Sequence, residues 1–535
     1  MSHPPTPNEQ APPGQHPPQT PPSPNHGLRI GLGLGLLALA LLATVIAYLL
    51  PTLRTVTMSF EESPGFFGEG PPDGTENYSD VLGGTGFLQG FASLTPVILG
   101  TVVTGAVIAP LVAWCVHNAG SGTRMAARIV GGIAVIVFAP AAMTIAEVVE
   151  HLAGDRGYAD LSLNSWTMLI SGMVFGAGIL VALAAFRGGE GTVKPTRAVV
   201  TAAGLTAFAL VAASLQTFTF PYISGFPSPP GMTPLSSIFN DGFRLFAFGS
   251  ASAKATILLA ILAVLGIGAA LLFILTRTRI EISPGPGSPK SFNVGAGVSG
   301  ILLLALFAAG TLVNLLPWLT RLTGPVESRF NETELMIDTW APPLITTAIA
   351  ITTALAGGFA IGALRPLGDG SRWLLLPFAP WLFVTSGPLA LANYESLAEA
   401  EALFTFQGLI PRAWIAVPAL FVFTALFWGL EDRRRSMTAL GAPASKANGA
   451  FAAAAWPLVA LVGMIVWLVH AQDTAWQMLA GDQTVNALMQ GVHTFYTEVS
   501  GLSIGYPIPL MVFFAAAMVL AAVFYLPRVG IRVGR

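Results

Sequence analysis

Long apolar runs are the feature that most constrains how this chain can fold. About a dozen stretches are dominated by Leu, Ala, Val, Ile and Phe, and many approach the ~20 residues that an α-helix needs to cross a bilayer core. Only 10% of the 535 residues are charged, against about 25% in an average soluble domain. Because so few charges cannot cover several soluble surfaces, the sequence predicts an all-α polytopic membrane protein in contact with the lipid bilayer. A membrane β-barrel would show short alternating segments instead.

The runs fall into two sets of six. The first set covers residues 30–50, 94–116, 127–148, 164–186, 197–217 and 252–276, and the second covers 295–317, 341–364, 373–392, 411–430, 450–470 and 506–527. A segment rich in Pro and Gly separates them. Six is an even number, so both halves would enter the membrane in the same orientation. The pattern predicts about 12 transmembrane helices in two parallel six-helix halves, with a pathway between them. The halves would be 28–283 and 294–535, joined by a linker at 284–293.

The N-terminal segment has a different composition. Residues 1–27 hold ten prolines between Pro4 and Pro24. So polar a segment cannot bury enough apolar surface to offset the entropy lost on ordering, and we therefore expect a disordered cytoplasmic tail. Arg29 then precedes the run 30–50. That run is long for a signal-peptide core and lacks a small-residue cleavage site, so we interpret it as a retained first helix.

Loop charges predict the orientation. Acidic residues gather in the gaps after the first and ninth runs, at 61–80 and 395–401. Basic residues occupy the alternate gaps, and these are Arg124, Arg128, Arg187, Lys194, Arg197, Arg277, Arg279, Lys290, Arg365, Arg372, Arg433, Arg434, Arg435, Lys446, Arg528, Arg532 and Arg535. They outnumber the exceptions, among them Arg54, Arg156, Arg321 and Arg329. The positive-inside rule therefore predicts a multi-pass protein of the cell membrane with both termini cytoplasmic.

Several function classes are disfavoured by the residues present. A net charge of −2 gives no basic surface for nucleic acid. The single cysteine, Cys115, allows no intramolecular disulfide, and no His-x-x-x-His pair indicates a metal site. None of the four lysines follows a glycine, so no phosphate-cradling ATP loop exists. We expect no cofactor and no enzymatic activity, and we interpret the charged clusters 147–151 and 395–401 as solvated loop charge.

Small and ionisable residues bear on the helix interiors. Gly357-Gly358 and the early glycines Gly31, Gly33 and Gly35 are expected to allow close helix packing in lipid. The central thirds of the runs carry no obvious ionisable residues. Since ion-coupled carriers relay charge through such groups, this disfavours a secondary transporter.

Ordered fragments along the chain resemble one transporter family. They are "LLPTLRTVTMSF" (49–60), "GTENYSDVL" (74–82), "AASLQTFTFPYISGFPSPPGMTPLSSIFNDGF" (212–243), "ASAKATILLAIL" (251–262), "LAGGFAIGALRPLGDGSRWLLL" (355–376) and "YPIPLMVFFAAAMVLAAVFYLPRVGIRVGR" (506–535). Their order is similar to that in the maltose-type sugar permeases of binding-protein-dependent ABC importers, with two different permease types in succession. The resemblance covers most of 30–535 and implies two fused permease halves.

The family's diagnostic element is a cytoplasmic loop that begins Glu-Ala-Ala, continues with Gly, ends in Leu-Pro and forms a short helix on the ATPase. Here "TALGAPASKANGAFAAAAWP" (438–457) occupies that place. One alignment matches Ala439, Phe451 and Pro457. Another matches the Gly-Ala centre through 440–442 and leaves three extra residues before Pro457. Thr438 or Arg435 stands where Glu is expected, and the first-half gap 187–196 is too short for the motif. The implied coupling residues are Thr438, Ala439, Leu440, Gly441, Ala442, Phe451 and Pro457.

The resemblance implies the transmembrane permease of an ABC importer, with carbohydrate as the solute. Separate ABC ATPase subunits would energise it, and an extracytoplasmic solute-binding protein would deliver the solute. Two alternatives stay open: a degenerate permease that acts as a membrane scaffold or accessory subunit, suggested by the eroded loops, and an ion-coupled carrier. The sequence assigns no substrate-contacting residue.

Overall fold

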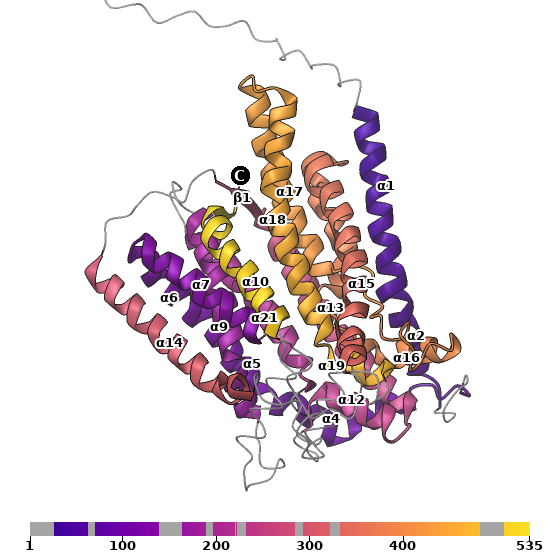
Figure 1. The fold of residues 1–535 in the computed structure, drawn as a ribbon. Coiled ribbons are helices and arrows are strands. Elements are labelled where there is room, and N and C mark those ends of the chain that lie inside the picture. The colour runs from indigo at the N-terminus through magenta and orange to yellow at the C-terminus, as the bar shows by residue number, and fades with distance from the viewer. Residues whose placement is uncertain are drawn as a thin grey trace, which may run out of the picture.

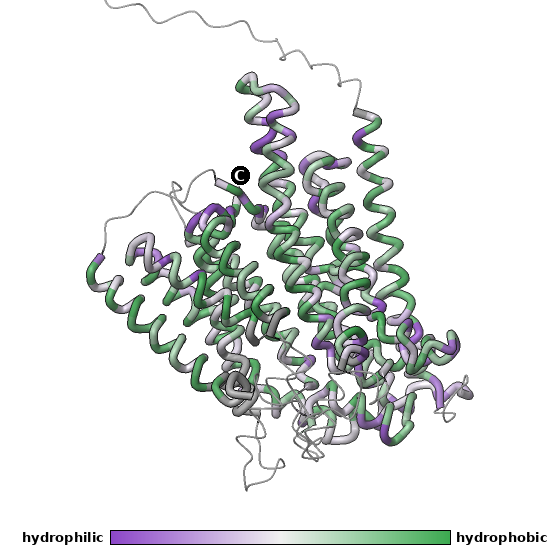
Figure 2. The backbone as a smooth tube through the Cα atoms, viewed as in Figure 1, coloured by the Kyte–Doolittle hydropathy of each residue, from purple (hydrophilic) through white to green (hydrophobic). Residues whose placement is uncertain are grey.

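The computed structural model describes residues 26–62, 70–138, 163–188, 196–219, 221, 232–283, 293–321, 332–481 and 508–534. Most of these residues lie in helices that run side by side between two ends of the molecule (Figure 1). Apolar residues fill the middle of the long helices, and hydrophilic residues gather toward their ends (Figure 2). The tail residues 1–25, the cluster 147–151 and the linker residues 284–292 lie outside the described residues.

The first half begins with one continuous rod, formed by α1 (His26–Thr44), the π-helical turn η1 (Val45–Leu49) and α2 (Leu50–Met58). The elements that follow are α3 (Glu76–Gly83), α4 (Thr85–Ser93), α5 (Thr95–Val102), η2 (Val103–Ile108), α6 (Ala109–Asn118), α7 (Ser121–Phe138), α9 (Leu163–Gly188), α10 (Thr196–Leu215), α12 (Pro234–Phe243), α13 (Phe248–Leu275) and β1 (Arg279–Ile282).

The second half has an equivalent order of long helices. Its elements are α14 (Val294–Arg321), α15 (Glu332–Phe359), η5 (Ala360–Leu364), η6 (Gly368–Trp381), η7 (Gly387–Leu389), α16 (Ala390–Glu399), α17 (Val417–Ala439), α18 (Ala444–Ala471), α19 (Thr474–Ala480), α21 (Ile508–Leu520), η9 (Ala521–Tyr525), η10 (Leu526–Arg528) and β2 (Val529–Arg532).

Long apolar helices make the chain an α-helical membrane protein. Seven described helices are long and apolar enough to cross a bilayer, and they cover 27–58, 85–118, 196–215, 248–275, 294–313, 336–364 and 444–471. Shorter apolar helices cover 172–188 and 512–528. The class predicted from the sequence is therefore confirmed, but the number of 12 membrane helices is not. Only residues 417–430 of the tenth run lie in α17, which continues into the charged residues 431–435, and part of the third run (139–148) lies outside the described residues.

The ninth run, 373–392, is not the membrane α-helix that its composition predicts. It forms the 3-10 helix η6, the short η7 and the beginning of α16. Pro377 and Pro380 lie inside η6. In an α-helix each proline would remove a hydrogen bond and collide with the carbonyl four residues earlier. With three residues per turn, both prolines fall on one side of the 3-10 helix, and its 14 residues extend about 28 Å at roughly 2 Å per residue.

The two halves exchange helices. The first helix, α1, packs against α15 and η5 of the second half, and α14, the first helix of the second half, packs against α6 and α7 (Figure 1). The last helices are exchanged as well, since α13 packs against η6 and α21 packs against α7. These contacts form equivalent pairs, so the packing follows a pseudo-two-fold pattern.

A two-stranded ribbon lies where the halves meet. Each strand follows the last helix of its half, and β1 pairs antiparallel with β2, with Ile280 opposite Ile531. The ribbon strands also lie on equivalent helices, since β1 contacts α17 and β2 contacts α9. The same pseudo-two-fold relation therefore extends to the strands.

The loops with basic residues gather at one end of the molecule. The beginning of α1, the C-terminus and the turn between α17 and α18 all lie at that end (Figure 1). We call it the hairpin end. The structure thus groups segments that the charge pattern assigned to the cytoplasmic side, and the cytoplasmic location itself stays a prediction.

Candidate functional site

The α17–α18 hairpin extends farther than the other helices at the hairpin end (Figure 1). Its turn is closed by two hydrogen bonds, from the N–H of Ala442 to the carbonyl of Met437 and from the N–H of Gly441 to the carbonyl of Thr438. This is the pattern of a Schellman motif, which needs a left-handed residue after the helix. Gly441 supplies it with φ +84°. The motif lets α17 end and α18 return within four residues.

The structure divides the predicted coupling residues between three places. Thr438 and Ala439 end α17, Leu440 to Ala442 form the turn, and Phe451 and Pro457 lie within α18. The expectation of a short separate helix within 438–457 is therefore wrong. The Schellman turn is compact, and the rest of the segment belongs to the two long helices α17 and α18. Residues 438–442 lie together at the tip, as the alignment through Gly441 implies. Phe451 instead stacks on Phe427, with ring centroids 5.7 Å apart, and Pro457 lines a cavity.

The tip surface consists of small residues around one exposed leucine. Leu440 is 88% exposed, and Ala439, Gly441 and Ala444 beside it are exposed as well. A single exposed leucine on a surface is ordinary. Here it stands on a rigid helical hairpin with no bulky neighbour in the turn, so the tip could enter a groove on another protein.

A buried carboxylate holds the base of the hairpin. Glu431 of α17 is 3% exposed and accepts hydrogen bonds from three arginines: Arg434 at 2.6 and 2.9 Å, Arg435 at 2.9 Å and Arg29 of α1 at 3.3 Å. Burial alone would raise its pKa, but the hydrogen bonds from Arg434 and Arg435 outweigh burial and hold the pKa of Glu431 at about 2. The carboxylate is therefore ionised at neutral pH and fastens α1 to the hairpin.

Sequence reasoning missed this cluster because residues 431–449 look like a basic loop. The spacing could have revealed it, since Glu431 stands three and four residues before Arg434 and Arg435. Those are the separations that bring side chains together on a helix.

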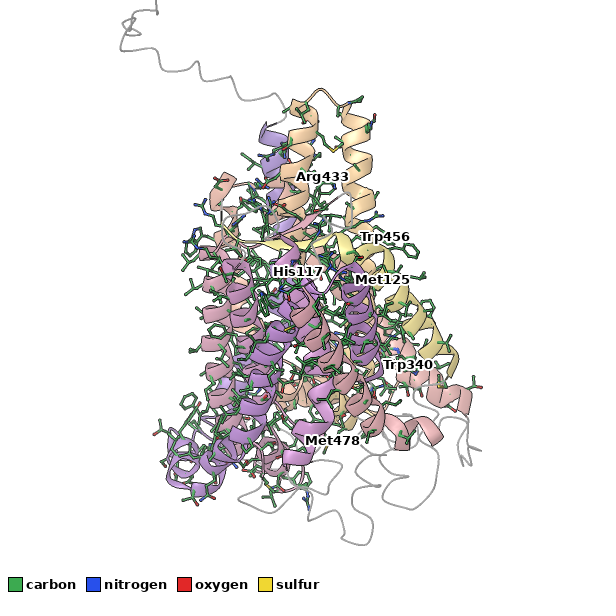
Figure 3. All side chains as sticks on the ribbon, turned by 90° about the vertical axis from the view of Figure 1, so that its left-hand side faces the viewer. His117, Met125, Trp340, Arg433, Trp456 and Met478 are labelled. Atoms are coloured by element: carbon green, nitrogen blue, oxygen red, sulfur yellow. The ribbon has the colours of Figure 1, made fainter. Side chains whose placement is uncertain are left out.

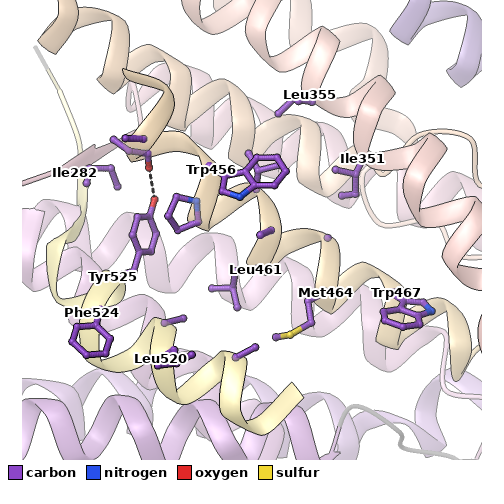
Figure 4. A pocket seen from close by; sticks show the side chains of 18 of the residues that line it. Ile282, Ile351, Leu355, Trp456, Leu461, Met464, Trp467, Leu520, Phe524 and Tyr525 are labelled. Atoms are coloured by element: carbon purple, nitrogen blue, oxygen red, sulfur yellow. Dashed lines mark hydrogen bonds between the residues drawn. The ribbon is translucent and has the colours of Figure 1, made fainter. Parts of the chain in front are cut away.

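A large cavity lies between α15, α18 and α21. Its volume is about 1260 Å³, and its walls include Ile351, Met464, Leu520 and the rings of Trp456 and Trp467 (Figure 4). The walls are mainly apolar, with Arg433 and Arg528 among the few charged residues that line it.

Different hydrogen bonds lie at the two ends of this cavity. Toward the hairpin end, Tyr525 donates a hydrogen bond of 2.8 Å to the carbonyl of Ala454 (Figure 4). Toward the opposite end, Trp467 donates to the carbonyl of Trp340 at 3.0 Å, and both rings pack against Phe514. Figure 3 shows Trp456 and Trp340 at these two levels of the molecule. The cavity could hold an apolar group of substantial size.

A smaller pocket of about 540 Å³, whose lining includes Arg54, Glu395 and Arg412, lies at the opposite end. Arg54 forms two hydrogen bonds of 2.7 Å with Glu395 and one of 2.8 Å with Glu61. Glu395 is therefore not the solvated loop charge predicted for 395–401, whereas Glu399 and Glu401 are exposed as expected. The pairing also accounts for Arg54 as an exception to the charge pattern, because two acids neutralise it.

The fold and these cavities define an α-helical membrane protein whose two halves share a packed interface. No family model, no curated protein and no solved structure matches the chain.

Proposed function

We propose that this chain is the transmembrane permease of an ABC importer, with both permease halves fused in one polypeptide. The reciprocal helix exchange carries the proposal: α1 packs on α15 and α14 packs on α6. Two equivalent halves around a shared interface would provide a pathway that opens alternately to either side. The resemblance to maltose-type sugar permeases is the second support.

The α17–α18 hairpin is the proposed contact with separate ABC ATPase subunits. It projects at the end that carries the basic loops, which the positive-inside rule assigns to the cytoplasm. The tip residues 438–442 present small side chains and Leu440 to a partner. The anchoring of the hairpin base by Glu431 would let a movement of the ATPase reach α1 directly.

Carbohydrate is proposed as the solute from the resemblance, and an extracytoplasmic solute-binding protein would deliver it at the end opposite the hairpin. The chain itself is proposed to have no catalytic role, since its sequence lacks an ATP-binding phosphate loop. The ion-coupled alternative gains little from the fold. Lys254 pairs with Asp241 near the beginning of α13, at a helix end rather than in its centre.

Co-purification tests the docking surface. Leu440→Asp should weaken capture of the ATPase encoded with this chain, because a carboxylate would have to be desolvated in the contact. Leu245→Asp is the matched control, since Leu245 is also exposed (65%) but lies between α12 and α13 at the other end. Both variants should reach the membrane at wild-type levels. Equal capture by both variants would show that the hairpin tip is not the contact.

A scaffold or accessory subunit is the second candidate. Its specific support is the first half, where α9 ends at Gly188, against β2, while the equivalent α17 continues ten residues past Gly429, its contact with β1, to Ala439. A single docking element would not couple both halves to a pair of ATPases. If the unmodified chain captures no ATPase from membranes that contain one, the scaffold function is favoured over the importer.

A further inference from the structure

A small pocket lined by arginines lies at the junction of the two halves, near the hairpin end. Its volume is about 190 Å³. It is formed by the residues after α13, by β1, by Arg365 after η5, by η6, by α17 and by the C-terminal end. The lining residues are Arg277, Arg279, Arg365, Asp369, Arg372, Trp428, Asp432 and Gly534.

The indole of Trp428 organises two of the arginines. The guanidinium carbons of Arg365 and Arg372 lie 3.9 and 4.0 Å from the ring centroid. Arg365 is fixed further by hydrogen bonds to the carbonyls of Gly362 and Trp428, both at 2.9 Å, and to the carboxylate of Asp432 at 2.7 Å. Stacking on an aromatic ring orients a guanidinium without neutralising its charge.

Arg372 has a buried donor without a partner. Its residue is only 7% exposed, and its Nη1 has no hydrogen-bond partner within the described part of the chain. Leaving a charged donor buried and unsatisfied is costly, so such a group is normally paired. Burial, and then the positive charges of Arg365, Arg279 and Arg277, lower the pKa of Arg372 to about 10. The group stays protonated at neutral pH.

The acids near the pocket are already engaged in part. Asp432 pairs with Arg365, and Glu281 pairs with Arg279 at 3.0 Å and with Arg532 at 3.2 Å. Four arginines and two aspartates line the pocket itself. Its lining therefore carries an excess of positive charge, and an anion would complete it.

We propose that this pocket binds a phosphoryl group, the chemistry that an anionic phospholipid head group and free phosphate share. Planar guanidinium groups suit phosphate oxygens, because each can donate two parallel hydrogen bonds. The pocket is smaller than the ~300 Å³ at which pockets for drug-sized ligands begin, so it suits one phosphoryl group rather than a nucleotide. It also lies next to the ends of the apolar helices 248–275 and 336–364, and basic pockets between membrane helices bind lipid head groups.

The test uses the purified full-length chain in micelles of a phosphate-free maltoside detergent, with thermal unfolding and native mass spectrometry as readouts. The protein in these micelles is compared with the same preparation after addition of phosphatidylglycerol or of inorganic phosphate, at matched ionic strength. The variants are Arg372→Gln and Arg277→Gln. Arg277 is half-buried at the pocket rim, so the second variant serves if the first does not fold. Arg197→Gln is the control, because it removes one exposed charge at the beginning of α10.

Phosphatidylglycerol should raise the unfolding temperature and remain bound in the mass spectrum. The pocket variants should bind it about tenfold more weakly, as expected for loss of one charge-assisted hydrogen bond, and the control should bind it normally. If inorganic phosphate alone gives the same stabilisation, and the pocket variants lose it, free phosphate is the ligand. The proposal is overturned if neither source stabilises the wild type, or if Arg372→Gln and Arg277→Gln retain the full effect.

Discussion

Ile280 and Ile531 face each other in the β1–β2 ribbon, and the carbonyl oxygen of each lies against a glycine of the helix beneath it. A Cβ atom at Gly429 of α17 would collide with the Ile280 oxygen, and one at Gly188 of α9 would collide with the Ile531 oxygen. Only glycine permits so close an approach of strand and helix. The two contacts are equivalent under the pseudo-two-fold relation.

We expect Gly429→Ala and Gly188→Ala to be destabilising to similar extents, by about 1–3 kcal/mol, because the added methyl group would push the ribbon away from its helix. Thermal unfolding of the purified variants measures the effect. Gly449→Ala in α18 is the control, since a Cβ there meets nothing within 4 Å. A Gly429→Ala protein as stable as the control would refute the close approach.

A second pair of helix glycines gives opposite expectations. At Gly358 of α15 a Cβ would lie 2.7 Å from the Cβ of Phe423, whereas at Gly463 of α18 the nearest atom is Ile351 Cγ1 at 3.9 Å. Gly358→Ala should therefore be destabilising, by about 1–3 kcal/mol. Gly463→Ala should be neutral or stabilising by up to about 1 kcal/mol, because alanine favours the helix. Unfolding midpoints that shift in the same direction would contradict the packing of α15 on α17.

Glu431→Gln should loosen the base of the hairpin. The variant should lose about 1–2 kcal/mol of folding stability at neutral pH. This loss is smaller than for a fully buried pair, because Arg29 and Arg435 are partly exposed and solvent screens their charges. The folded pKa of about 2 lies below the ordinary 4.5, so the ionised carboxylate contributes stability fully above about pH 4.5. That contribution is lost as the pH falls toward 2.

The difference between wild type and Glu431→Gln should accordingly shrink between about pH 4.5 and pH 2. Thermal unfolding across this range measures it, with Glu399→Gln as the control at an exposed carboxylate. A difference that stays constant over the whole range would show that Glu431 does not act through its charge.

Cysteine accessibility tests the orientation. After replacement of Cys115, an impermeant thiol reagent added outside intact cells should label Glu399→Cys, which lies at the end opposite the hairpin. Lys446→Cys, exposed near the hairpin tip, should react only after the membrane is permeabilised. The reverse pattern would place the hairpin and both termini outside the cell.

Apolar runs predicted most helix positions well, because about 20 apolar residues suffice to specify a helix in lipid. The ninth run shows where composition fails, since Pro377 and Pro380 disfavour an ordinary α-helix within an otherwise apolar stretch. The Gly357-Gly358 pair does allow close packing, as predicted, against α17. Gly31 and Gly35 do not, since a Cβ at either would meet nothing within 4 Å.

The partners of the helices could not be predicted in the same way. Hydrophobic composition marks a segment as helical but is satisfied by any apolar neighbour, so nothing in α1 specifies α15. The tip of the candidate coupling site could be predicted, because Gly441 lies between the tenth and eleventh apolar runs. The Glu431 cluster did not, because a run of charges after an apolar helix was interpreted as a loop, whereas α17 continues through it.

The exchange of first helices has a consequence for biosynthesis. The helix α15, on which α1 packs, begins at Glu332, 288 residues after α1 ends at Thr44. At roughly 5–20 residues per second, the ribosome needs about 15 to 60 seconds to make that stretch. During this time α1 lies in the bilayer without its final neighbour, and the surface of α6 that packs against α14 is likewise without that helix until α14 is made. Fusing both halves in one polypeptide guarantees that the missing neighbour arrives, in equal number and in the same patch of membrane.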